Sequence, residues 1–78
     1  MPYIKDDRRA RARNYPASAG ELNFAITSLL KEYIERETLS YQVINDIVGA
    51  LEGAKAEFYR RVAVPYENAK MAENGDVY

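Results

Sequence analysis

The clearest pattern in the sequence is an apolar residue at every third or fourth position between residues 19 and 36. Just before it, Ser18 and Glu21 have the S-x-x-E spacing of a capping box, in which each side chain accepts a hydrogen bond from a backbone N–H of the first turn. Residues three and four apart share one helix face, so the spacing predicts an amphipathic helix over 19–36. Its apolar stripe consists of Leu22, Ala25, Ile26, Leu29, Leu30 and Tyr33.

A second apolar period follows Ser40, a residue type that suits a helix N-cap. This helix is expected to end or kink near Val64, because Pro65 lacks a backbone N–H and clashes with the preceding turn. The break at 38–40 is short, so we expect the two helices to form an antiparallel hairpin with their stripes facing each other. The second stripe consists of Ile44, Ile47, Val48, Leu51, Phe58 and Val62.

Shorter helical segments are predicted at both ends of the chain. Residues 5–13 are rich in alanine and arginine and precede Pro16, while "PYENAKMAE" starts with a proline, which a first helical turn tolerates. "ENGD" is a turn signal. The predicted fold is all-α in one domain over 1–78: a basic N-terminal arm (1–17), a helical hairpin (18–64), and a C-terminal short helix and turn (65–78), with both ends packed on the hairpin.

The small size of the chain favours self-association. A protein of about this size buries only about 60% of its unfolded surface, and the 78 residues include no cysteine that could form a disulfide. We therefore expect well-packed helices and a homo-oligomer. Pro65 is expected to turn the chain back, so that Tyr66, Met71, Val77 and Tyr78 pack on the hairpin or on a neighbouring copy.

Two features point to helix contacts beyond the hairpin. Gly49, Gly53 and Ala56 lie on a different face from the apolar stripe, and two glycines four apart permit close approach of another backbone. That approach is either a crossing within the chain or a subunit interface. Phe24 points away from its own stripe; its partner is either Tyr3 or Ile4 folding back, or a second subunit or partner protein.

Basic residues are concentrated at the N-terminus. The net charge of −1 divides into +3 over residues 1–13 and −4 over the rest. An arm with four arginines resembles those that neutralise nucleic-acid phosphates. We favour the alternative, a solvated helix face paired with the acidic body, and do not expect nucleic acid as the partner. The arginines are Arg8, Arg9, Arg11 and Arg13.

The stretch "EFYRRVAVPYE" combines arginines with tyrosines, which together can hold a nucleotide-like anion through planar donors and stacking faces. The residues concerned are Tyr59, Arg60, Arg61 and Tyr66. We favour a second interpretation, in which the arginines cap helix carbonyls and pair with Glu57 or Glu67.

Enzymatic function is not expected. The chain has no histidine, the commonest general base and zinc ligand, and no phosphate loop, nucleophile motif or metal spacing. We expect no cofactor and no metal. No apolar run approaches the roughly 18 residues of a membrane span, and the N-terminus lacks the apolar core of a signal peptide, so a cytoplasmic protein is expected.

The chain resembles a family of small uncharacterised proteins from bacteria and phages, a domain of unknown function. The resemblance is carried by "MPYIK", "AGELNFAIT", "INDIVGALEGAKAEFYRRVAVPYE" and "ENGDVY", and is weakest over residues 6–17. It implies no activity, ligand or catalytic residue, but it implies that the tail is ordered.

These observations favour a non-enzymatic helical interaction protein that self-associates and binds a protein partner or a small ligand. The alternatives are a phage-type protein that sequesters a nucleotide or cyclic dinucleotide, and a nucleic-acid-binding protein that uses the N-terminal arginines.

Overall fold

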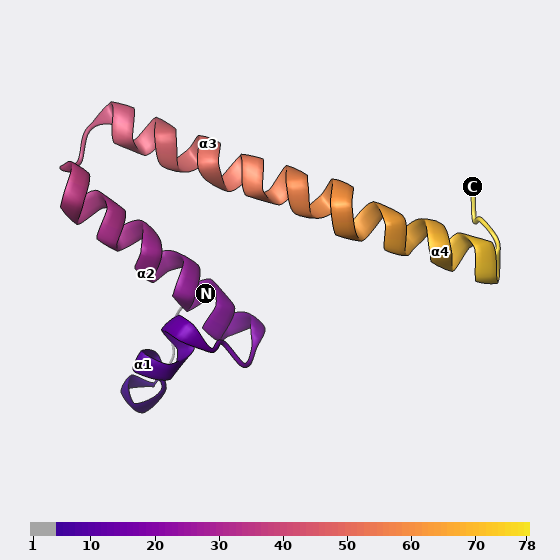
Figure 1. Ribbon diagram of the computed structural model, residues 1–78, viewed down its shortest axis with the longest axis horizontal. Coiled ribbons are helices and arrows are strands. Elements are labelled where there is room, and N and C mark those ends of the chain that lie inside the picture. The colour runs from indigo at the N-terminus through magenta and orange to yellow at the C-terminus, as the bar shows by residue number, and fades with distance from the viewer. Residues whose placement is uncertain (1–4) are drawn as a thin grey trace. The chain divides into compact units, whose positions relative to one another are not determined.

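The computed structural model describes residues 5–78, and most of them are helical (Figure 1). No strand occurs in this range, which confirms the predicted all-α class. In chain order the elements are α1 (Asp6–Asn14), α2 (Ala19–Glu37), α3 (Tyr41–Phe58), the π-helical segment η1 (Tyr59–Ala63) and α4 (Val64–Asn74).

Serine side chains begin the two long helices. The Ser18 hydroxyl oxygen accepts a hydrogen bond from the Glu21 N–H at 3.1 Å, and the Ser40 hydroxyl oxygen accepts one from the Val43 N–H at 3.2 Å. Each bond satisfies an N–H that has no partner within the helix. Both caps were predicted, and α2 differs from its predicted bounds by one residue at its end.

The chain divides into two units, Met1–Val43 and Ile44–Tyr78, and each is described by itself. In unit 1, α1 packs on α2. Ala12 of α1 is fully buried and Glu21 of α2 is 7% exposed. The expected helix over 5–13 is therefore present, and it is docked rather than free.

In unit 2 the helix continues past Pro65. α3, η1 and α4 follow one another without an intervening loop (Figure 1), and Phe58, Ala63 and Val64 all have right-handed helical backbone angles. The Val64 N–H donates to the Tyr59 carbonyl, five residues back instead of four. This wider turn precedes a proline in the first turn of α4, where its missing N–H costs little. An end of the helix near Val64 is therefore not found, and the prediction that Pro65 turns the chain back is wrong.

The C-terminal tail begins at Gly75, which ends α4 with φ at +86°. The Tyr78 N–H donates to the Asp76 carboxylate at 2.9 Å. Val77 is 92% and Tyr78 110% exposed, so these side chains form no packed core within unit 2. The predicted packing of the tail on the hairpin is therefore not found within unit 2, and its packing on another copy stays a prediction.

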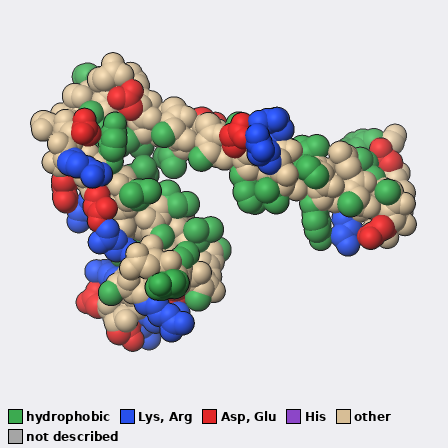
Figure 2. Space-filling model, in the orientation of Figure 1, with side chains coloured by type: hydrophobic (Ala, Val, Ile, Leu, Met, Phe, Trp, Pro, Cys, Tyr) green, Lys and Arg blue, Asp and Glu red, His purple; other side chains and the backbone are tan. Residues whose placement is uncertain are grey.

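The apolar stripes of both units are exposed. Among residues 5–78, the buried apolar residues are Ala12 and Val43. Leu29 on α2 is 63% exposed, and Val48 and Phe58 on α3 are 54% and 63% exposed. Figure 2 shows apolar side chains along the side of the long helix opposite to a group of basic and acidic side chains. Neither unit therefore has a core of its own that covers these stripes.

Candidate interaction surface

The apolar stripe of unit 2 is the most extended candidate surface. It runs along α3 into η1 at helical spacing, through Ile44, Ile47, Val48, Leu51, Phe58 and Val62. Only Ile47 among these is half-buried. An exposed helical stripe with apolar residues at i, i+3 and i+4 is typical of a face that packs against another helix.

Lys55 lies on the same face as this stripe, by its position four residues after Leu51. A single cation within an apolar helix seam restricts how a partner helix can align, because its charge must reach water or an acceptor.

The glycine face is open in the described chain. A Cβ placed on Gly49 or Gly53 meets no atom within 4 Å. No other element of unit 2 therefore makes the predicted close crossing there. The subunit-interface alternative for Gly49, Gly53 and Ala56 stays a prediction.

Phe24 is half-buried on α2. It lines a shallow depression of about 290 Å³ together with Arg13, Ser28, Lys31, Glu32 and Glu35. The neighbouring charges make this depression a poor match for an apolar partner. Its predicted intramolecular partners, Tyr3 and Ile4, lie outside the described residues.

In unit 1, three of the four N-terminal arginines form ion pairs with acidic side chains. Arg8 bonds Glu21 at 2.8 Å, Arg9 bonds Asp6 at 2.8 Å, and Arg13 pairs with Glu32. Arg11 contributes positive charge near Glu21. This arrangement agrees with the favoured interpretation, a helix face paired with acidic residues, since phosphate binding would compete with these carboxylates. Nucleic-acid binding stays an untested prediction.

Glu21 connects α1, the preceding loop and the first turn of α2. Its carboxylate accepts a hydrogen bond from the Ala17 N–H at 3.1 Å as well as from Arg8. The Ala17 hydrogen bond lowers the pKa of Glu21; burial partly opposes this, and the charges of Arg8 and Arg11 lower the pKa further. The capping pattern identified Glu21, but nothing in the sequence identified Arg8 as its partner.

The arginines and Tyr66 of the predicted arginine–tyrosine patch contact different partners. Arg60 and Arg61 both bond Glu57, at 2.7 Å and 2.9 Å. The Tyr66 ring instead lies 5.6 Å from the Lys70 ammonium, a cation–π contact. One carboxylate therefore engages both arginines, as the favoured interpretation proposed for Glu57, and a nucleotide phosphate would have to displace it.

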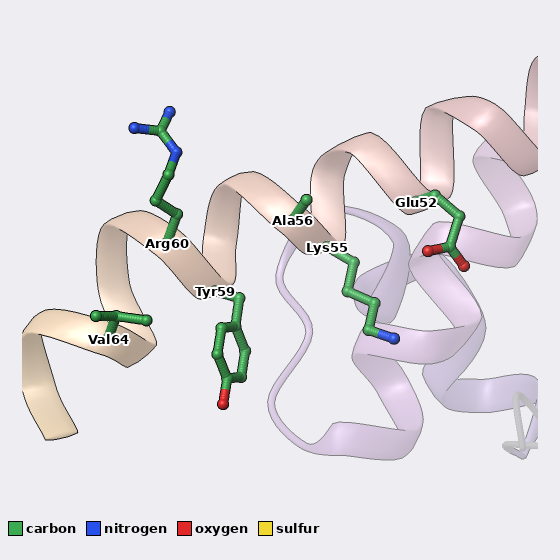
Figure 3. Close-up of a pocket in the computed structure, with 6 residues that line it drawn as sticks. All are labelled: Glu52, Lys55, Ala56, Tyr59, Arg60 and Val64. Carbon is green, nitrogen blue, oxygen red and sulfur yellow. The ribbon is translucent and has the colours of Figure 1, made fainter.

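A hollow of about 480 Å³ lies along the end of α3 and η1, lined by Glu52, Lys55, Ala56, Tyr59, Arg60 and Val64 (Figure 3). Figure 3 shows Tyr59 and Arg60 pointing away from each other. They do not converge on one point, as an aromatic platform and a guanidinium would to hold one base and its phosphate. Nucleotide binding by Tyr59, Arg60, Arg61 and Tyr66 stays a prediction, which a thermal-shift screen with nucleotides tests directly.

Other kinds of site have little support in the described chain. Across residues 5–78, no three acidic side chains come close enough together to hold a metal ion. In the same range, no helix has both the length and the apolar character of a membrane span.

Comparison with known proteins identifies a family but no individual relative. No curated protein and no solved structure matches the chain. One family model matches residues 1–77, nearly the full length, and its description is Domain of unknown function (DUF6899). The chain therefore belongs to the DUF6899 family.

Proposed function

We propose that this protein is a non-enzymatic helical interaction protein that self-associates through its apolar stripes. In this proposal α2 closes on α3 as an antiparallel hairpin, and the apolar surface that remains is covered by another copy. The proposal is carried by one observation, the exposure of both stripes beside only two buried apolar residues in the described chain.

The stability of isolated helices also supports the proposal. An amphipathic helix in water gains most of its stability from packing its apolar face. In unit 2 no residue from 44 to 78 is buried, so the long helix needs a packing partner to persist.

Sedimentation equilibrium over a range of concentrations tests the proposal. We expect the wild-type protein to be an oligomer at micromolar concentration. Val48→Asp places a charge on the stripe and should shift the protein to monomer or unfold it. Ala50→Asp adds the same charge to the opposite face of α3 and should have little effect. A monomeric wild type would overturn the proposal.

The sequence-based expectations of a bacterial or phage source and a cytoplasmic location accompany this proposal. Both stay predictions, as does the existence of a separate protein partner.

A further inference from the structure

We infer that two copies of the chain pair along the distal part of the unit 2 helix, residues 57–74, which we call the distal segment. This inference rests on the proposed function and specifies where the contact between copies lies. The partner is a second copy of the same chain, and the contact is formed by the apolar side chains of the distal segment.

The long helix of unit 2 is longer than α2. α2 has 19 residues, whereas α3, η1 and α4 together have 34. At a rise of about 1.5 Å per residue, these lengths are about 28 Å and about 50 Å. In a hairpin that starts at Ser40, α2 can lie beside the long helix only as far as about Tyr59. The remaining residues extend beyond the reach of α2.

α1 does not lengthen α2 at its N-terminal end. Its ion pairs join Arg8 to Glu21 and Arg13 to Glu32, so α1 lies along α2 over that stretch. Ala12 is buried in the same contact. Because α1 is docked on the side of α2, it cannot also continue the line of α2 to cover the distal segment.

Apolar side chains of the distal segment are exposed. Phe58, Val62 and Tyr66 recur every four residues, and they are 63%, 51% and 64% exposed. Val64 and Met71, seven residues apart, are 37% and 41% exposed. Beyond the reach of α2, the distal segment thus presents Val62 and Tyr66 on the face that continues from Phe58, and Val64 and Met71 on another face, over about 14 Å of helix. Nothing in unit 2 covers these side chains.

The balanced charge of the distal segment favours a second copy over a strongly charged partner. The distal segment carries three acidic and three basic residues, and Arg60 and Arg61 are already paired with Glu57. A surface without net charge does not repel an identical surface, and it offers no field that would select a polyanion or a basic protein. Two identical helices can pack about a twofold axis, so that each copy contributes the same patch to the contact.

Sedimentation equilibrium of matched variants tests this inference. Val62→Asp places a charge in the apolar face of the distal segment and should raise the dissociation constant between copies by about tenfold or more. Asn68→Asp adds the same charge at a polar position of the same segment and should leave the dissociation constant near the wild-type value. Circular dichroism at high concentration shows whether each variant is still helical.

Hydrogen exchange of the wild-type protein provides a second measurement that needs no substitution. Above the dissociation concentration, the amides of 57–74 should exchange more slowly than after dilution below it, with less change over 19–37. If Val62→Asp unfolds the chain, the concentration-dependent hydrogen exchange of the wild-type protein tests the inference instead.

The outcomes separate the two proposals. An oligomeric wild type that is unaffected by Val62→Asp and shows no concentration-dependent protection over 57–74 would overturn this inference and leave the proposed function standing. A monomeric wild type would overturn both.

Discussion

The guanidinium of Arg8 and the carboxylate of Glu21 meet at 2.8 Å across thirteen residues of sequence, and this contact joins α1 to the first turn of α2. The same carboxylate accepts the Ala17 N–H, and the Glu21 N–H donates to the Ser18 hydroxyl. One residue thus stabilises the start of α2, the preceding loop and the docking of α1.

Substitutions of Glu21 should separate these roles. Glu21→Gln keeps an oxygen that can accept the Ala17 N–H but loses the charge that attracts Arg8, whereas Glu21→Ala loses both. We expect the melting temperature to fall in the order wild type, Gln, Ala. The amides of α1 should exchange fastest in the Ala variant. Glu35→Gln, on the exposed surface of α2, is the control. Equal melting temperatures for all four proteins would contradict this role.

The docking of α1 should depend on pH. The pKa of Glu21 lies below its ordinary value in the folded chain, first because of the Ala17 hydrogen bond and then because of Arg8. Ionised Glu21 therefore adds stability that is present above the unfolded-state pKa and is lost as pH falls through the folded-state pKa. An NMR titration of the Glu21 carboxyl carbon and the Ala17 amide should give a common midpoint below that of an ordinary glutamate. A midpoint at or above the ordinary value would refute the assignment.

Alanine at the open glycines should stabilise α3. A Cβ at Gly49 or Gly53 meets no neighbour within 4 Å, and glycine inside a helix costs about 0.5–1 kcal/mol relative to alanine. Gly53→Ala should raise the unfolding free energy by roughly that amount, measured by urea denaturation. The subunit count should not change, because the proposed contacts use another face. Dissociation of the oligomer would show instead that the glycine face is the interface.

Thr38 is the strained position between α2 and α3. Its φ is +66°, in the left-handed region, where a β-branched residue is disfavoured. Such strain costs about 1–3 kcal/mol, and glycine relieves it at the expense of greater unfolded-state entropy. We expect Thr38→Gly to raise stability by about 1 kcal/mol. Thr38→Val, which keeps the branched shape, should not do so. A lower melting temperature for Thr38→Gly would argue against strain at this position.

Gly75 should be required for the end of α4. Its φ of +86° and ψ of 156° belong to a region that residues with a side chain rarely occupy. Gly75→Ala should cost about 1–3 kcal/mol locally, which would appear as faster amide exchange in the last turn of α4. Ala72→Gly, which weakens the helix interior without affecting its end, is a useful comparison. Unchanged exchange near Asn74 in Gly75→Ala would contradict the requirement.

Several elements could be predicted because their causes are local. Ser18 and Ser40 bond N–H groups three residues away, so their capping role is visible in a window of a few residues. The apolar period predicted α2 to within one residue, and the ENGD turn predicted the end of α4 near Gly75. The pairing of Glu57 with the adjacent arginines follows from helical spacing of three and four.

By itself, then, the sequence determined that the chain is helical, where the long helices begin and which faces are apolar. Only the tertiary structure decided that Arg8 docks on Glu21 and that Ala12 is buried, because these contacts depend on how residues 15–18 turn α1 back onto α2. It also decided that the helix continues past Pro65. A proline removes one hydrogen bond, and whether the backbone then ends, bends or widens into a π turn depends on how the neighbouring carbonyls find new donors.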